Sequence, residues 1–249
     1  MWRSWRELFY QAAKKGKVEE VKEILMKNPT LDVNWRGEHG RTPLHIACLN
    51  GHDSHPAIDV SLKNQYGFTP FYDACFSGHP CIRRLLKDSR VNPNEPNREG
   101  YTPLRNAADE GHDNVIKWWI ASGREMNLGE SGDYFTDAIG VATLNGKAGA
   151  VNLLETFKVN PGETRHAMRV ELGWYDELAA EMFALVVFVS DGLLQINDTT
   201  PSPARFFSIA SQLPLELQMV LCRRVVGLSK EIIPGKDTEV AFKCLAIRL

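Results

Sequence analysis

The stretch Gly40-Arg-Thr-Pro-Leu-His-Ile-Ala-Cys48 decides the fold, because the chain repeats it. The same phrase returns as Gly67-Phe-Thr-Pro-Phe-Tyr-Asp-Ala-Cys75 and as Gly100-Tyr-Thr-Pro-Leu-Arg-Asn-Ala-Ala108. Three residues after each copy comes the pair Gly-His, at residues 51–52, 78–79 and 111–112. Weaker copies, at residues 8–13 and 136–142, bracket the three clear ones. A period of about 33 residues predicts a solenoid built from short structural repeats.

The residue types in the phrase predict two helices in each repeat. Threonine caps a helix whose first turn accepts proline, because the backbone nitrogen there has no partner inside the helix. Alanine and cysteine are small enough to let neighbouring helices approach. The glycine of the Gly-His pair supplies a left-handed end to the first helix. Apolar residues at helical spacing then predict a second helix, for example over residues 18–25 and 115–120. Its apolar face needs the next repeat, so no single repeat is expected to fold alone.

These phrases resemble the ankyrin repeat, and the resemblance covers residues 5–163, about five repeats. The resemblance implies an all-α solenoid with hairpin loops. We expect an ankyrin-repeat domain at residues 1–163, capped by a helical domain at residues 164–249. It also implies that the chain is a protein-binding scaffold or adaptor. Its partner, a protein of unknown identity, would lie on a concave surface made of hairpin tips and first helices.

The positions that the family varies for recognition can be carried over onto this chain. They are Glu38, His39, Arg41, Leu49, Asn50, Gln65, Tyr66, Phe68, Phe76, Ser77, Arg98, Glu99, Tyr101, Asp109, Glu110, Asp133, Phe135, Leu144 and Asn145. Among them, Tyr66, Phe68, Phe76 and Tyr101 would form an aromatic centre of the kind that carries much of a binding energy. The alternative is that Phe68 and Phe76 only pack between repeats.

The second repeat is shorter than the others. The phrase threonines, at positions 42, 69, 102 and 136, are spaced by 27, 33 and 34 residues. The loss lies between His52 and Asp59, which are seven positions apart where the next two repeats have 13. About two turns of the second helix are therefore missing. Either the chain has a groove on the convex side of the solenoid, or the sequence omits residues there.

Beyond Pro161 the period stops, and residues 164–249 are expected to form helices separated by a loop at 197–203. A helix over residues 170–195 should be buried nearly all round, because apolar residues occupy all of its faces. The last helix is expected at residues 240–247. The segment Leu213-Pro-Leu-Glu-Leu217 resembles the opening of an F-box, which would make the chain a substrate receptor of a cullin-type ubiquitin ligase. The alternative is an ordinary helix with buried leucines that helps to shield the last repeat.

Histidines and cysteines in the repeats fit structural roles. Four histidines, at positions 45, 52, 79 and 112, occupy places where the family uses histidine to bond backbone atoms. Cys48 and Cys75 fill one equivalent position, so packing is expected rather than redox chemistry. The basic groups at residues 14–17 and 83–87 are expected to be solvated helix faces. No metal site and no cofactor are predicted.

Composition and charge exclude several classes of protein. The net charge is −2 and 43% of residues are hydrophobic, so nucleic acids and anionic membranes would find no strongly basic surface. The longest apolar run, residues 182–189, is too short to cross a bilayer. Five separated cysteines and no apolar stretch at the start favour a reduced, cytoplasmic protein. We expect a monomer.

Catalysis is not expected, because no nucleophile elbow, phosphate loop or spaced metal-ligand motif occurs in the sequence. The remote alternative is an active site in the C-terminal domain. Asp176, Glu177 and Glu181 lie at helical spacing there and could supply a carboxylate pair. Three carboxylates beside a buried helix more often form its solvent edge.

Overall fold

The computed structural model describes residues 4–52, 59–79, 81–191, 201–226 and 241. Every element within these ranges is a helix, which confirms the all-α class. The chain divides into two compact units, residues 1–168 and 169–249, and each is described by itself. The division falls inside helix α10 (Pro161–Glu171), a few residues beyond the expected boundary at residue 163.

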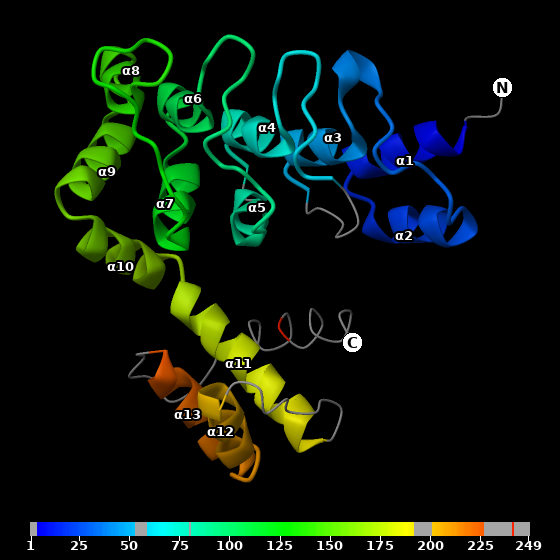
Figure 1. Ribbon diagram of the computed structural model, residues 1–249, viewed down its shortest axis with the longest axis vertical. Helices are drawn as coiled ribbons and strands as arrows, with labels where there is room; N and C mark the ends of the chain where they lie inside the picture. Colours follow the sequence, from blue (N-terminus) through cyan, green and yellow to red (C-terminus); the bar gives the residue numbers. More distant parts are fainter. Residues whose placement is uncertain (1–3, 53–58, 80, 192–200, 227–240, 242–249) are drawn as a thin grey trace. The chain divides into compact units, whose positions relative to one another are not determined.

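The first unit is a row of short helices joined by projecting hairpin loops (Figure 1). The first helices of the repeats are α1 (Trp5–Lys14), α3 (Pro43–Leu49), α4 (Pro70–Ser77), α6 (Pro103–Glu110) and α8 (Ala138–Leu144). The second helices are α2 (Val18–Lys27), α5 (Ile82–Lys87), α7 (Asp113–Ser122) and α9 (Ala148–Val159). First helices pack in chain order, and so do α5, α7 and α9. A 3-10 turn, η1 (Glu38–Gly40), lies in the first hairpin.

Threonine caps begin the first helices of the three clear repeats, as predicted. The hydroxyls of Thr42, Thr69 and Thr102 each accept a hydrogen bond from the backbone nitrogen three residues later, at 3.1–3.4 Å. The fifth repeat differs. Helix α8 is capped by Asp137, whose carboxylate accepts from the nitrogen of Gly140 at 2.7 Å, while the Thr136 hydroxyl turns back to Asp133. The register of the last phrase is therefore shifted by one residue.

A glycine and a histidine from successive repeats lie in contact along the stack. Gly78 has φ +71° and ends α4 in the left-handed conformation. A Cβ at this glycine would lie 2.5 Å from the His112 ring, and one at Gly51 would lie 2.8 Å from the His79 ring. The His112 ring also lies 2.9 Å from the carbonyl oxygen of Phe76. His45 and His52 also lie within hydrogen-bond distance of backbone carbonyls, which confirms the predicted structural role for these two and for His112.

One hydrophobic core extends through the second to fifth repeats, and a smaller one lies in the first repeat. Trp119 is fully buried at the centre of the larger core and contacts Phe71 edge to face, with ring centroids 5.1 Å apart. Cys48 and Cys75 are fully buried in the same core, which confirms their packing role. Burial raises the pKa of the Cys75 thiol well above its ordinary value.

The second unit contains α11 (Trp174–Ser190), α12 (Pro201–Ala210) and α13 (Leu215–Val225). Helix α11 packs against both of the others. The prediction of one helix over residues 170–195, buried nearly all round, is wrong for residues 170–191, and residues 192–195 lie outside the described ranges. Gly173 takes φ +67° and separates α10 from α11, and Leu178 and Val170 are exposed. The buried face of α11 is a stripe of small residues and Phe183.

Two further expectations for the second unit need correction. One is that the carboxylates at residues 176–181 form a solvent edge, and the other is that the leucines at residues 213–221 are buried. The Asp176 carboxylate lies 2.8 Å from the guanidinium of Arg223, which is buried on α13, so Asp176 is a structural partner. Leu215 is 55% exposed and Leu217 is 51% exposed, whereas Leu221 packs against the core of this unit. The short stretch between His52 and Asp59, the start of the loop at 197–203 and the helix at 240–247 lie outside the described residues, apart from residue 241.

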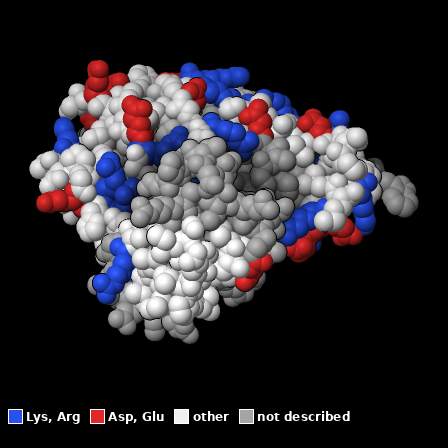
Figure 2. Space-filling view, turned by 60° about the horizontal axis from the view of Figure 1, so that its bottom comes forward, with Lys and Arg blue, Asp and Glu red and all other residues white. Residues whose placement is uncertain are grey.

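Charges of both signs are distributed over the molecule. On the face in Figure 2, basic and acidic residues are interspersed. Lys14, Lys15 and Lys17 are exposed, and the guanidinium carbon of Arg83 lies 4.9 Å from the ring centroid of Trp118. Within the described part of the chain, no helix is long and apolar enough to cross a membrane, and no group of three side chains could hold a metal ion.

Candidate protein-binding surface

Backbone hydrogen bonds join each hairpin to the next. The nitrogen of Gln65 donates to the carbonyl of His39 at 3.1 Å, and the nitrogen of Arg98 donates to the carbonyl of Tyr66 at 3.2 Å. Inside the second hairpin, the buried Asn64 side chain accepts from the nitrogens of Tyr66 and Phe68. The hairpin tips are thus held by buried polar groups, which fix the direction of the side chains that they carry.

The sixth residue of the repeated phrase connects helices α3 and α6 to the hairpins that follow them. Nε2 of His45 lies 2.9 Å from the carbonyl oxygen of Phe68, and Nε of Arg105 donates to the carbonyl of Tyr134 at 3.3 Å. Tyr72 occupies the same position in the third repeat but stacks on the Phe68 ring of the hairpin before its own helix, with centroids 4.3 Å apart, and its hydroxyl accepts a hydrogen bond from the Asn106 side chain on α6. His45 and Arg105 therefore perform one task, because each reaches the following hairpin from the first turn of its helix.

A first aromatic group lies on the second hairpin. The Tyr66 ring is 5.7 Å from the Phe68 ring and 5.8 Å from the His39 ring of the hairpin before it. The Tyr66 hydroxyl and the Gln65 amide both lie within hydrogen-bond distance of Nδ1 of His39, at 3.2 and 3.0 Å. Tyr66 remains 44% exposed. The group is therefore an ordered aromatic surface at the hairpin tip.

A second aromatic group lies on the third and fourth hairpins. The rings of Tyr101, Tyr134 and Phe135 are mutually 5.4–5.7 Å apart. The Arg105 guanidinium lies 4.8 Å from the Tyr101 ring centroid and 5.1 Å from that of Tyr134. It also forms an ion pair of 2.6 Å with Asp109. Because a buried arginine and its carboxylate support these rings, their geometry is set before any partner arrives.

Other expected positions lie along the ends of the first helices. Asp109 of α6 pairs with Arg105 and accepts a hydrogen bond from the side chain of Asn145 at the end of α8. Leu144 is largely exposed beside it, and Phe76 is exposed at the end of α4. The structure therefore brings residues of adjoining repeats together along this line.

None of the expected positions is buried. Those classed as exposed are Glu38, His39, Asn50, Gln65, Tyr66, Phe76, Arg98, Glu99, Glu110, Phe135, Leu144 and Asn145. Those that are partly buried are Arg41, Leu49, Phe68, Ser77, Tyr101, Asp109 and Asp133. The stacking of Phe68 on Tyr72 fits the packing alternative for this residue, whereas the exposure of Phe76 does not.

Sequence reasoning missed Tyr134 and Arg105. Tyr134 is 63% exposed and belongs to the second aromatic group. It lies in a hairpin longer than the others, so no fixed position of the repeat pointed to it. Arg105 stands where His45 stands in the phrase, and this equivalence was the available signal.

A buried ion pair lies beneath the first part of the surface. The Asp73 carboxylate on α4 is fully buried, and the Arg41 guanidinium lies 3.5 Å from it. Within the described residues neither carboxylate oxygen has a hydrogen-bond partner. Burial raises the pKa of Asp73 to about 6, although Arg41 acts in the opposite direction. Burial also lowers the pKa of His45 to about 4, so this imidazole is neutral in the folded protein at pH 7.

Two family models match the part of the chain that carries these hairpins. A model of three ankyrin repeats matches residues 54–130, and a single ankyrin-repeat model matches residues 39–60. Residues 39–130 are ankyrin repeats. The helix pairs α1/α2 and α8/α9 flank the matched region and repeat its two-helix plan. No curated protein matches the chain.

Ankyrin repeats mediate protein–protein interactions. The family match therefore indicates protein binding and does not identify the partner. Neither model reaches the F-box-like segment at residues 213–217, and no observation supports a ubiquitin-ligase role. Enzymatic activity is not typical of ankyrin repeats.

Proposed function

We propose that the chain is a scaffold or adaptor that binds one protein partner through the hairpin tips and the ends of the first helices. These form the concave surface that the resemblance implies. The expected residues listed above line this surface, and the two aromatic groups lie at its centre. The observation that carries the proposal is the fixed geometry of these groups on adjoining hairpins.

Fixed aromatic side chains favour binding for a physical reason. A partner that buries Tyr66, Tyr101, Tyr134 and Phe135 removes a large apolar area from water. Because hairpin hydrogen bonds and Arg105 already hold the rings, little side-chain entropy is lost when the partner docks. Hydrogen-bonding groups at the rim, such as Gln65 and Asp109, would then select among partners.

The test is affinity purification with the intact chain, comparing wild type with the double variant Tyr66→Ala, Tyr101→Ala. A matched control is Met26→Ala, Val159→Ala, which removes two exposed apolar side chains from the second helices. We expect a partner that wild type and control retain and that the tyrosine variant loses by at least about tenfold in Kd. Circular dichroism establishes that all three chains are folded.

An unchanged partner affinity in the folded tyrosine variant would contradict the proposal. Retention of a cullin and its adaptor by wild type would instead support the ligase alternative. We also propose that the protein is a cytoplasmic monomer, because Cys75, Cys81 and Cys222 are free and buried. Light scattering of the purified chain and imaging of a fluorescent fusion test these two statements.

A further inference from the structure

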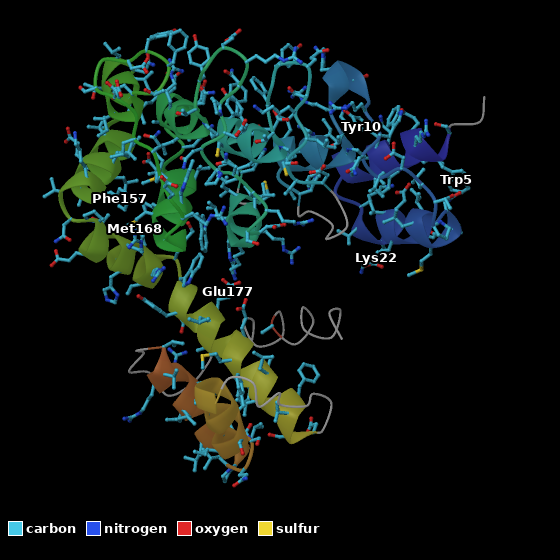
Figure 3. All side chains as sticks on the ribbon, viewed as in Figure 1. Trp5, Tyr10, Lys22, Phe157, Met168 and Glu177 are labelled. Atoms are coloured by element: carbon cyan, nitrogen blue, oxygen red, sulfur yellow. The ribbon has the colours of Figure 1, made fainter. Side chains whose placement is uncertain are left out.

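A cavity lies between the first helix and the first hairpin, at the N-terminal end of the proposed surface. Its volume is about 310 Å³, and its walls come from Glu7 and Tyr10 on α1 and from residues 35–38 of the hairpin. Figure 3 shows Tyr10 between α1 and this hairpin. A space of this size accommodates the end of one long side chain.

Two aromatic rings form part of the wall. The rings of Tyr10 and Trp35 meet at 86°, with centroids 5.8 Å apart. The close approach of Gly37, where a Cβ would lie 2.8 Å from the Tyr10 ring, fixes that ring. Tyr10 is only 3% exposed, and within the described residues its hydroxyl has no hydrogen-bond partner. Because that hydroxyl is closed to solvent, Tyr10 contributes its ring to the cavity wall.

The charges at the cavity are unevenly matched. Arg36 is a wall residue, but its guanidinium donates to the carbonyls of Lys63 and Gly40, at 2.6 and 3.2 Å. The carboxylates of Glu7 and Glu38 form no ion pair with any residue that the structure describes. Burial and then the Glu38 carboxylate raise the pKa of Tyr10, which keeps its hydroxyl protonated. The cavity therefore presents an aromatic face, the Arg36 guanidinium and two carboxylates that form no ion pair with the described residues, of which Glu7 accepts a hydrogen bond from the Gln11 side chain at 2.9 Å.

We propose that this cavity binds a basic side chain, lysine or arginine, of the protein partner. The inference rests on the proposed function, since it assigns partner chemistry to one end of the same surface. The cation would lie between the Glu7 and Glu38 carboxylates, with its apolar stem against Trp35. Carboxylates and an aromatic face attract the same charge, so they act together.

The test uses small probes on the intact chain, so it does not require the partner. N-acetylarginine amide and N-acetyllysine amide are titrated while the Trp35 indole N–H is followed by NMR, its signal assigned with Trp35→Phe. The neutral analogues N-acetylcitrulline amide and N-acetylnorleucine amide are the ligand controls. We expect saturable shifts with at least one cationic probe, weaker at high salt and about tenfold weaker in Glu7→Gln, Glu38→Gln.

Glu130→Gln is the matched variant, since it removes an exposed carboxylate from the fourth hairpin, and it should bind as wild type does. The proposal is overturned if neither cation shifts the indole signal, or if the neutral analogues bind as tightly as the cations. Because the ligand and salt comparisons use wild type, they decide the question even if the double variant does not fold. If the cavity binds no cation, the two aromatic groups can still bind a partner. The partner test with Tyr66 and Tyr101 therefore distinguishes failure of the cavity proposal from failure of the proposed function.

Discussion

Replacing Asp73 with asparagine should change how the free energy of unfolding depends on pH. In the folded protein burial raises the pKa of Asp73 from 3.8 to about 6. Between these values the folded chain holds a proton that the unfolded chain has released. The free energy of unfolding therefore increases as the pH falls from 6 to 4. At 1.36 kcal/mol per pKa unit, the carboxyl contributes about 3 kcal/mol over this interval.

His45 acts in the opposite direction over almost the same interval. Burial lowers its pKa from 6.5 to about 4, so the unfolded chain takes up a proton in this range and the folded chain does not. Stability from His45 is complete above pH 6.5 and is lost as the pH falls through 4, again by about 3 kcal/mol. In wild type the contributions of Asp73 and His45 to the pH dependence nearly cancel. Asp73→Asn removes the Asp73 contribution and leaves that of His45.

Urea unfolding followed by circular dichroism at pH 7, 6, 5 and 4 measures the effect. Relative to wild type, Asp73→Asn should lose about 3 kcal/mol between pH 7 and pH 4. His45→Gln should gain by a similar amount, and the double variant should parallel wild type. The variants are compared by how steeply the free energy of unfolding changes with pH. Loss of the Asp73–Arg41 ion pair changes that free energy by a similar amount at every pH, so it does not affect the slope. Parallel curves for Asp73→Asn and wild type would refute the reasoning, and Glu130→Gln controls for loss of an exposed carboxylate.

Three further predictions concern stability. Trp119→Ala should cost about 3–5 kcal/mol in urea unfolding, because a fully buried indole leaves a cavity beside Phe71, and a loss below 1 kcal/mol would contradict that packing. Thr102→Ala should lower the free energy of unfolding by about 1 kcal/mol, because the variant loses the cap of α6. Thr136→Ala should lower it by less, because Asp137 caps α8. Equal losses in the two variants would contradict the shifted register of the fifth repeat. Residues 164–249 were predicted to cap the array. Deleting residues 172–249, the part of this segment beyond α10, should lower the melting temperature or cause aggregation, and an unchanged, monomeric truncation would show that this part is dispensable.

The sequence was informative wherever the fold depends on neighbouring residues. The threonine caps, the left-handed glycines and the second helices follow from short-range rules, and the structure confirms them at Thr42, Thr69 and Thr102. The same rules failed at the fifth repeat, where Asp137 competes with Thr136 for the cap. A one-residue choice between two good capping residues depends on the hairpin that precedes them.

Features that depend on contacts between repeats were not predictable in the same way. The pairing of Asp73 with Arg41 and the cavity beside Tyr10 join residues about 30 positions apart. Nothing in a single phrase indicates which side chains will meet there. In the second unit no repeat supplied a register, so the break at Gly173 and the Asp176 partner on α13 were both missed.

The contact between the glycine of one repeat and the histidine ring of the next has a consequence for protein engineering. It acts as a joint that sets the spacing between modules, because a Cβ at Gly51 or Gly78 would collide with the following ring. The joint does not recur at Gly146, where a Cβ would meet no described atom within 4 Å. An additional module could therefore be spliced between the third and fourth repeats if it brings its own glycine and its own histidine. Such a chimera would lengthen the row of hairpins without redesign of its neighbours.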